Sequence, residues 1–164
     1  MKKTLLALAA CLVATGILAQ NKALPSANVK TLEGQSVNVQ ELAKDKITVF
    51  SFWATWCRPC LEELEAIQEL YPEWREKYDM QLVAVSVDDA RQLARVKPLA
   101  ANRGWEYIVV TDAAKEFQNL MNVANPPVTI LVNKKGEIVY EHLGYAPGAE
   151  WELEEKIKAT AAKK

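Results

Sequence analysis

The feature that most constrains the fold of this chain is a pair of cysteines placed directly after a hydrophobic run. Residues 47–53, Ile-Thr-Val-Phe-Ser-Phe-Trp, have the apolar, aromatic and β-branched composition of a buried strand. Residues 57–60, Cys-Arg-Pro-Cys, follow, and beyond them apolar residues recur with helical spacing. We therefore expect a buried strand that leads into a helix beginning at or near Cys57.

The two cysteines have the spacing of a dithiol that can close into a local disulfide. Cys57 lies at the expected helix start, where free backbone N–H groups and the helix dipole favour a thiolate over a thiol. Cys57 is therefore the expected attacking thiol. Cys60, one helical turn further on, should be more buried and would resolve the mixed disulfide that Cys57 forms with a partner.

The cysteine pair has two other possible interpretations, a zinc site and a structural disulfide. Half of a zinc site has the same Cys-x-x-Cys spacing, but zinc needs two more ligands, and the remaining soft candidates are Cys11 and His142. Since Cys11 falls in an expected leader segment, we expect neither a metal site nor a cofactor. A purely structural disulfide that closes so short a loop would stabilise the fold little.

Residues 52–60, Phe-Trp-Ala-Thr-Trp-Cys-Arg-Pro-Cys, resemble the F-W-A-x-W-C-x-P-C signature of thioredoxin-fold oxidoreductases. Thr55 makes the segment most similar to the extracytoplasmic TlpA/ResA-like branch, and the resemblance runs from about Leu24 to the C-terminus. It implies an α/β thioredoxin fold, with a central mixed β-sheet flanked by helices, an N-terminal β-hairpin and a helix–strand insertion. It also implies thiol–disulfide exchange with client proteins through a Cys57–Cys60 redox disulfide.

The resemblance adds Pro127 to the expected site. Residues 125–129, Asn-Pro-Pro-Val-Thr, are similar to the G-x-P-T-T segment of the family, whose proline is cis and faces the cysteines. Here Asn125 replaces the glycine, and Pro126 lacks the backbone N–H that could pair with a bound client. The alternative is that both prolines begin a strand with trans peptide bonds.

Glu63 is the fourth expected catalytic residue. TlpA/ResA-like reductants have a glutamate at this place that assists the dithiol, and a carboxylate beside a buried thiol could accept its proton. Ser51 stands where cytoplasmic thioredoxins carry a buried aspartate, which leaves Glu63 as the available acid. The alternative is that Glu63 is a surface residue like its neighbours Glu62 and Glu65.

Four further residues are expected to support the site. Trp53 and Trp56 flank the cysteines, and we expect them mainly to pack beneath and beside the disulfide. Pro59 fits an early helical position and restricts the loop. Arg58 places a positive charge next to the redox couple, or else is a solvated side chain with little effect on it.

The first 19 residues have the pattern of a secretory leader. A basic end, Met1–Lys3, precedes an apolar run over residues 4–18, and Ala19 is a plausible cleavage position. Residues 8–11, Leu-Ala-Ala-Cys, also resemble a bacterial lipobox, so lipidation at Cys11 or an uncleaved membrane anchor are alternatives. A cleaved leader, a lipidated Cys11 and an uncleaved anchor would each place the domain in or facing the periplasm. The expected organisation is signal peptide 1–19, linker 20–27 and thioredoxin-like domain 28–164.

Hydrophobic periodicity and turn residues place the remaining elements. We expect Pro72 to kink the helix that follows Cys57 or to end its first part. Asp88 or Asp89 should cap a helix that runs through Arg95. The other expected elements are a hairpin over 29–39, one helical turn over 41–44, strands 81–87 and 107–110, helices 98–102 and 113–120, a hairpin over 128–142, and a closing helix over 149–161 that packs through Trp151, Leu153 and Ile157.

Composition limits the partners of the chain. The formal net charge of −1 gives no sign of a nucleic-acid partner, and we expect a monomer. The family implies reduction of disulfides in exported proteins, including apocytochrome c, with electrons from a membrane thiol carrier. The alternatives are an oxidant of the DsbA sort, a peroxiredoxin-like peroxidase and a non-enzymatic docking module; the P-x-x-x-T-x-x-C context of peroxiredoxins is not matched before Cys57.

Overall fold

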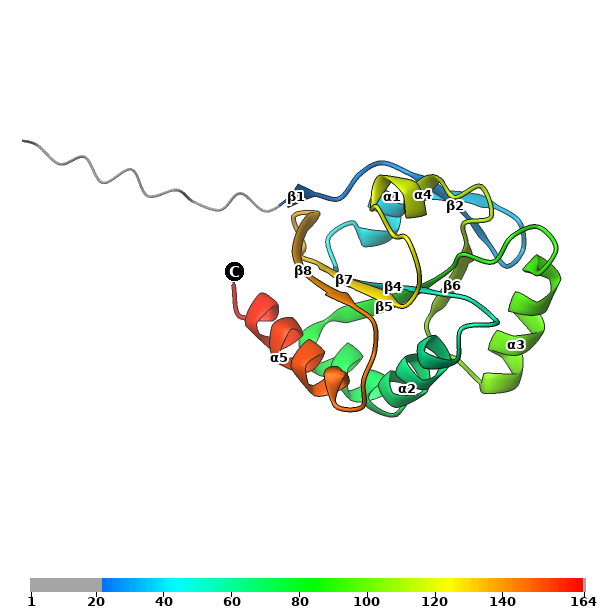
Figure 1. Ribbon diagram of the computed structural model, residues 1–164. Helices are drawn as coiled ribbons and strands as arrows, with labels where there is room; N and C mark the ends of the chain where they lie inside the picture. The colour runs from blue at the N-terminus through cyan, green and yellow to red at the C-terminus, as the bar shows by residue number, and fades with distance from the viewer. Residues whose placement is uncertain (1–21, 164) are drawn as a thin grey trace, which may run out of the picture.

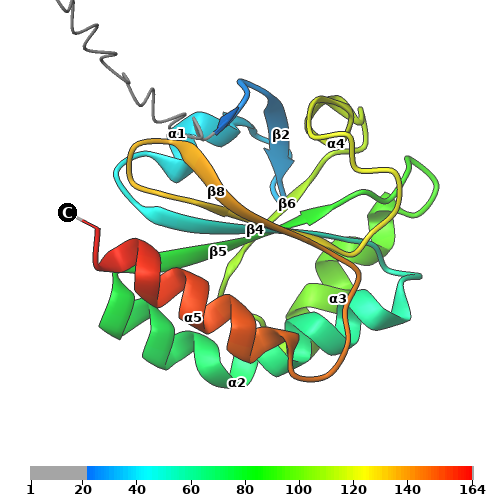
Figure 2. The same ribbon diagram turned by 60° about the vertical axis from the view of Figure 1, so that its left-hand side comes forward.

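A mixed β-sheet forms the centre of the protein in the computed structural model, which describes residues 22–163 (Figure 1). The sheet has eight strands in the order β1-β8-β7-β4-β5-β6-β2-β3. Helices α2, α3 and α5 cover one face of it, and α1 and α4 cover the other (Figure 2). The strands are β1 (Lys22–Ala23), β2 (Asn28–Thr31), β3 (Ser36–Asn38), β4 (Ile47–Trp53), β5 (Met80–Ser86), β6 (Ile108–Thr111), β7 (Val128–Val132) and β8 (Glu137–Leu143). The helices are α1 (Val39–Ala43), α2 (Arg58–Tyr78), α3 (Val96–Arg103), α4 (Glu116–Leu120) and α5 (Ala149–Ala161), with a 3₁₀ turn at Leu93–Arg95.

Strand β4 lies in the middle of the sheet, and all seven of its residues are buried. It pairs in parallel with β5 and antiparallel with β7. Side chains alternate along a strand, so Phe50 and Phe52 meet Phe117 of α4, with ring centroids 5.2 and 5.0 Å apart. Ser51 and Trp53 point to the opposite face, where α2 lies. The segment after Trp53 therefore lies at one edge of a sheet that has helices on both faces (Figure 2).

The N-terminal hairpin and the insertion expected from the sequence are confirmed. Strands β2 and β3 pair antiparallel, and Gly34 lies in their turn at φ +84°, a conformation that glycine adopts without strain. In the insertion, α3 is followed by Gly104, which has a left-handed backbone conformation and is the C-cap of the helix. Strand β6 pairs with both β5 and β2, and the hairpin thereby becomes part of the central sheet.

Pro72 lies inside α2 without ending it, since the helix continues to Tyr78. Two other local expectations are wrong. No helix begins at Asp88 or Asp89; after β5 there are turns and the 3₁₀ turn at residues 93–95. The physical reason is that the Asp88 carboxylate is engaged elsewhere in the fold. Trp151 does not pack in the core either, since it is 56% exposed while Leu153 and Ile157 are buried.

Residues 22–27 contact the domain, although we expected a linker over 20–27. Leu24 and Ala27 are buried, β1 pairs with the start of β8, and the Ala27 carbonyl accepts a hydrogen bond from the Val39 N–H at 2.9 Å. The expected leader, with Cys11, lies outside the described residues. Within residues 22–163, no helix is both long and apolar enough to cross a membrane.

Candidate active site

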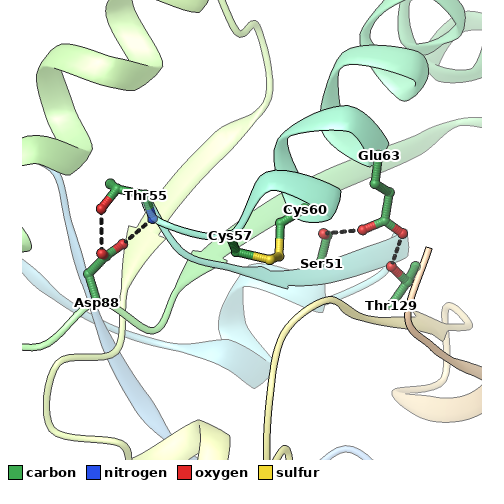
Figure 3. The surroundings of a disulfide bond; sticks show 7 residues. All are labelled: Ser51, Thr55, Cys57, Cys60, Glu63, Asp88 and Thr129. Atoms are coloured by element: carbon green, nitrogen blue, oxygen red, sulfur yellow. Dashed lines mark hydrogen bonds between the residues drawn. A yellow bond between two sulfur atoms is a disulfide. The ribbon is translucent and has the colours of Figure 1, made fainter. Parts of the chain in front are cut away.

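The two cysteines lie where β4 ends and α2 begins, and they form a disulfide with a Cα–Cα distance of 5.3 Å (Figure 3). Cys57 has an extended backbone and is the N-cap of α2, with Pro59 in the first turn. In this disulfide form the Cys57 side chain makes no capping hydrogen bond, but it lies at the helix end whose first N–H groups lack partners within the helix. Both side chains are largely enclosed: Cys57 is 5% exposed and Cys60 is fully buried, in the order that the sequence predicts.

Glu63 is buried one helical turn beyond Cys60, with 4% of its surface exposed. The Thr129 hydroxyl of β7 donates a hydrogen bond to Oε1 at 2.5 Å, and the Ser51 hydroxyl of β4 donates one to Oε2 at 3.3 Å (Figure 3). Burial raises the pKa of Glu63 to about 7, because desolvation disfavours the charged form more than the two hydroxyl donors favour it. The carboxyl can thus gain or lose a proton near neutral pH.

A small recess between β8 and α5 adjoins Glu63. Its walls include Thr129, Tyr140, His142 and Glu150, and its volume of about 10 Å³ corresponds to about one water molecule. The negative charge of Glu150 contributes to the raised pKa of Glu63. Ile67, Ala149 and Leu153 complete the lining, so the buried carboxyl lies beside a small recess with both polar and apolar walls.

The Pro126–Pro127 peptide bond is cis, as the family resemblance implies. Pro127 is buried immediately before β7, and its carbonyl accepts a hydrogen bond from the Gly144 N–H at 2.9 Å. Val128 pairs with Phe52 near the end of β4. The proline segment therefore lies at the same edge of the sheet as the disulfide.

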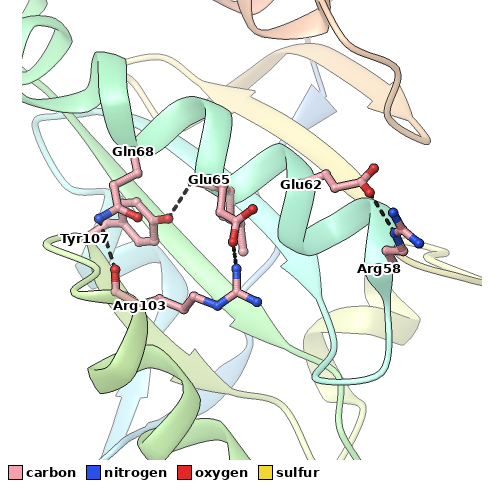
Figure 4. A network of polar contacts seen from close by, with 7 residues as sticks. Arg58, Glu62, Glu65, Gln68, Arg103 and Tyr107 are labelled. Atoms are coloured by element: carbon pink, nitrogen blue, oxygen red, sulfur yellow. Dashed lines mark hydrogen bonds and ion pairs between the residues drawn. The ribbon is translucent and has the colours of Figure 1, made fainter.

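Arg58 points away from the redox couple into solvent. Its side chain is 87% exposed and its Nε lies 2.9 Å from the Glu62 carboxylate (Figure 4). Further along the same helix, Glu65 forms an ion pair with Arg103 of α3. Glu62 and Glu65 are thus surface acids, whereas Glu63 between them faces the sheet.

The two tryptophans differ in their surroundings. Trp53 is fully buried and packs edge-on against Trp105, with ring centroids 4.9 Å apart. Trp56 is 57% exposed directly before Cys57. Trp53 is therefore part of the core beneath the site, and Trp56 is available to an incoming protein.

Sequence reasoning missed three residues that the structure brings to the site: Thr129, Thr55 and Asp88. Thr129 directly contacts Glu63, and Asp88 accepts two hydrogen bonds from Thr55. One signal could have found the second pair, since the carboxyl ends of parallel neighbouring strands meet at one edge of a sheet. Among the described residues, no three His, Cys, Asp or Glu side chains gather as metal ligands would.

Comparison with known proteins gives consistent matches. Residues 20–141 match the model of the AhpC/TSA family. The chain is 30% identical over 123 residues to the thiol-disulfide oxidoreductase ResA of Bacillus thuringiensis (strain Al Hakam), an alignment that covers 75% of this chain and 69% of that protein.

Solved structures show the same architecture. The solution structure of a thioredoxin-like protein from Porphyromonas gingivalis superposes with a TM-score of 0.76 at 41% identity, over 87% of this chain and 94% of that one. A putative thiol:disulfide interchange protein DsbE from Chlorobium tepidum gives a TM-score of 0.77 at 22% identity, over 88% of this chain and 99% of that one. At this lower identity the second match shows the fold alone.

Proposed function

This chain belongs to the AhpC/TSA family and is a thiol–disulfide oxidoreductase with a thioredoxin-like fold, and from that premise we propose that it reduces disulfides in proteins outside the cytoplasm. The observation that carries the proposal is the pairing of a helix-start disulfide with a buried carboxyl whose pKa is about 7. Such a carboxyl can accept a thiol proton at neutral pH, as a dithiol reductant requires.

The proposed reaction uses the reduced form of the protein. The Cys57 thiolate attacks one sulfur of a client disulfide, a mixed disulfide forms, and the first client sulfur leaves as a thiolate. Glu63 then accepts the proton of Cys60, and the resulting thiolate attacks the Cys57 sulfur. The second client thiolate is released, and Cys57 and Cys60 are left as the disulfide. Two electrons pass to the client, and the Thr129 and Ser51 hydroxyls hold the Glu63 carboxylate in place.

Two observations support the reducing direction. A positive charge at the thiolate would stabilise the dithiol and make the couple more oxidising, but Arg58 is solvated and paired with Glu62. The sequence also has no cysteine beyond Cys11, Cys57 and Cys60. The domain therefore keeps its fold without a structural disulfide while it cycles through the dithiol state.

The remaining parts of the proposal concern partners and place. The leader-like residues 1–19 support export to the periplasm, with a lipid anchor at Cys11 or an uncleaved anchor as alternatives. In that compartment a membrane thiol carrier would return electrons to the disulfide. Oxidised cysteines of exported proteins, including apocytochrome c, are the proposed clients. Trp56 is exposed and directly precedes Cys57, and Pro127 precedes β7 at the same edge of the sheet; both are proposed contacts for a client chain.

Reduction of insulin disulfides tests the activity directly. The wild-type protein should precipitate insulin B chains in the presence of dithiothreitol, and Cys57→Ser should reduce the rate to that of dithiothreitol alone. Peroxide consumption by the reduced protein should match that of a free thiol. Rapid peroxide consumption that depends on Cys57, with no insulin reduction, would replace this proposal with the peroxidase alternative.

A further inference from the structure

Asp88 is a fully buried carboxylate that the proposed reaction does not use. It follows β5, and its two oxygens accept hydrogen bonds from three donors. The Thr55 hydroxyl donates to Oδ1 at 2.6 Å, the Thr55 N–H to Oδ2 at 2.9 Å, and the Ser86 hydroxyl to Oδ2 at 2.8 Å. A buried carboxylate without partners is strongly unfavourable, so this set of donors is what allows Asp88 to lie there.

The contact between Asp88 and Thr55 connects the ends of β5 and β4 at the edge of the sheet that carries the disulfide (Figure 3). Strands β4 and β5 are parallel, and the Val87 N–H continues their pairing by donating to the Trp53 carbonyl at 2.8 Å. The turn from Ala54 to Cys57 closes through the Cys57 N–H, which donates to the Ala54 carbonyl at 3.0 Å. Thr55 lies inside this turn, and Asp88 holds it through both its backbone and its side chain.

We propose that Asp88 is a positioning residue that acts through Thr55 to hold the Cys57 sulfur over the start of α2, an inference that rests on the proposed attacking role of Cys57. The thiolate gains its stability from a fixed placement against the first N–H groups of the helix. The turn from Ala54 to Cys57 sets the position of Cys57. The two hydrogen bonds between Asp88 and Thr55 restrain this turn by connecting it to the end of the neighbouring strand. Loosening the turn lets the sulfur move away from those N–H groups.

Two variants separate positioning from a direct effect of charge. Thr55→Val removes the hydroxyl contact and keeps the shape of the side chain, the backbone contact and the Asp88 charge. Asp88→Asn keeps the size of the side chain but removes its negative charge and puts an amide donor against the Thr55 or Ser86 donors. Loss of a nearby negative charge alone would lower the pKa of the Cys57 thiol. A loosened turn raises it in both variants, so the two mechanisms differ in sign for Asp88→Asn.

Asp112→Asn is the matched control. Asp112 is a buried aspartate that follows the next strand, β6, and its carboxylate accepts hydrogen bonds from the N–H groups of Glu116 and Gln118 at 3.0 and 2.7 Å. It therefore holds the start of α4, and its carboxylate makes no hydrogen bond to the described residues of the Thr55 turn. Its replacement should lower the free energy of unfolding without changing the chemistry of Cys57.

The experiment follows alkylation of the reduced full-length proteins by iodoacetamide against pH, with the modified cysteine identified by mass spectrometry. Thr55→Val and Asp88→Asn should both raise the pKa of Cys57, by about half to one pKa unit, so that alkylation below that pKa slows by about three- to tenfold. Asp112→Asn should give the wild-type profile. The measurements are made where circular dichroism shows each variant to be folded.

The contrary outcomes are distinct. A lowered pKa in Asp88→Asn with no change in Thr55→Val would assign Asp88 a charge effect alone, and wild-type profiles in both would assign it a structural role alone. Either result overturns the inference. Should Cys60 be alkylated before Cys57 in the wild-type protein, the proposed function itself fails, whatever the variants show.

Discussion

Glu63 differs from the neighbouring glutamates because it faces the sheet and they face solvent. Its ordinary pKa is 4.5 and its pKa in the folded protein is about 7. Between these values the folded state binds a proton that the unfolded state does not. The contribution of Glu63 to stability is therefore fully present below pH 4.5 and is lost as the pH rises through 7.

Glu63→Gln should remove this dependence on pH. Relative to the glutamine variant, the free energy of unfolding of the oxidised wild-type protein should fall by on the order of 3 kcal/mol between pH 4.5 and pH 8. Urea denaturation across this range measures the difference. Glu69→Gln, at an exposed position of the same helix, is the control and should follow the wild type. A constant difference between wild type and Glu63→Gln would contradict a raised pKa.

The roles of the two sulfurs can be separated by trapping. Cys60→Ser should accumulate mixed disulfides with client proteins, because the attacking thiol remains and the resolving thiol is absent. Cys57→Ser should accumulate few, since the remaining Cys60 is fully buried. Non-reducing electrophoresis of both variants after exposure to an oxidised client measures the ratio, and the reverse ratio would exchange the two roles.

At the scale of single residues, the sequence predicts groups that act through local spacing. Cys57 and Cys60 are three positions apart, so their disulfide can be predicted without knowing the rest of the fold. The sequence does not decide whether Glu63 is buried or exposed, because its neighbours Glu62 and Glu65 are also glutamates. Its spacing from Cys60, Leu64 and Ile67 puts it on the apolar stripe of α2, which was the available signal. The contact between Asp88 and Thr55 spans 33 positions and depends on strand pairing.

At the scale of elements, α2 shows how tertiary packing can override a local signal. Pro72 removes one backbone N–H from the helix and predicts either a kink or the end of the first part of the helix, but α2 continues to Tyr78. Tyr71, Trp74 and Tyr78, which surround or follow it, are all buried. The burial of large side chains contributes about 1.5–3 kcal/mol each, so together they outweigh the roughly 3 kcal/mol that an interior proline costs.

Helix α5 offers a test of which face stabilises the fold. Ile157 is fully buried and α5 packs beside α2, whereas Trp151 of the same helix is 56% exposed. Ile157→Ala should lower the free energy of unfolding by about 2–5 kcal/mol. Trp151→Ala should change it by about 0.5 kcal/mol or less. Equal losses in urea denaturation would mean that Trp151 is packed in solution.

The strands and most helices could be predicted from the sequence, because a buried strand and an amphipathic helix have different periods. The bounds predicted for β4 and for α5 are those observed. The prediction of a helix after Asp88 was wrong because of a contact with a residue distant in the sequence. An aspartate directly after a strand has the pattern of an N-cap, but the Asp88 carboxylate binds Thr55 of another strand end and Asp89 accepts from the Arg91 N–H in a turn.

At the scale of the whole molecule, the reduction potential decides the direction of electron flow. With Arg58 paired to Glu62, the helix start is the main feature that stabilises the thiolate, a contribution of about 0.3–1 kcal/mol. For a two-electron couple this amounts to roughly 6–20 mV, small beside the roughly 150 mV that separates thioredoxin from DsbA. We therefore expect a potential nearer that of thioredoxin, about −270 mV.

Equilibration with glutathione or dithiothreitol buffers measures this potential. The oxidised protein should also resist urea better than the reduced protein. A potential near −120 mV, with the reduced form the more stable to urea, would favour the oxidant of the DsbA sort over the reductase.

The disulfide and the first described residues lie at opposite ends of the central strand β4. Lys22 pairs with Ile138, which lies opposite Val132, and Val132 pairs with Thr48 at the start of β4. The length of β4, about 20 Å, separates that end from the turn that carries Cys57. A fusion partner joined directly at Lys22 would therefore lie at the end of the sheet opposite the turn that carries Cys57, and would leave that turn open to client proteins.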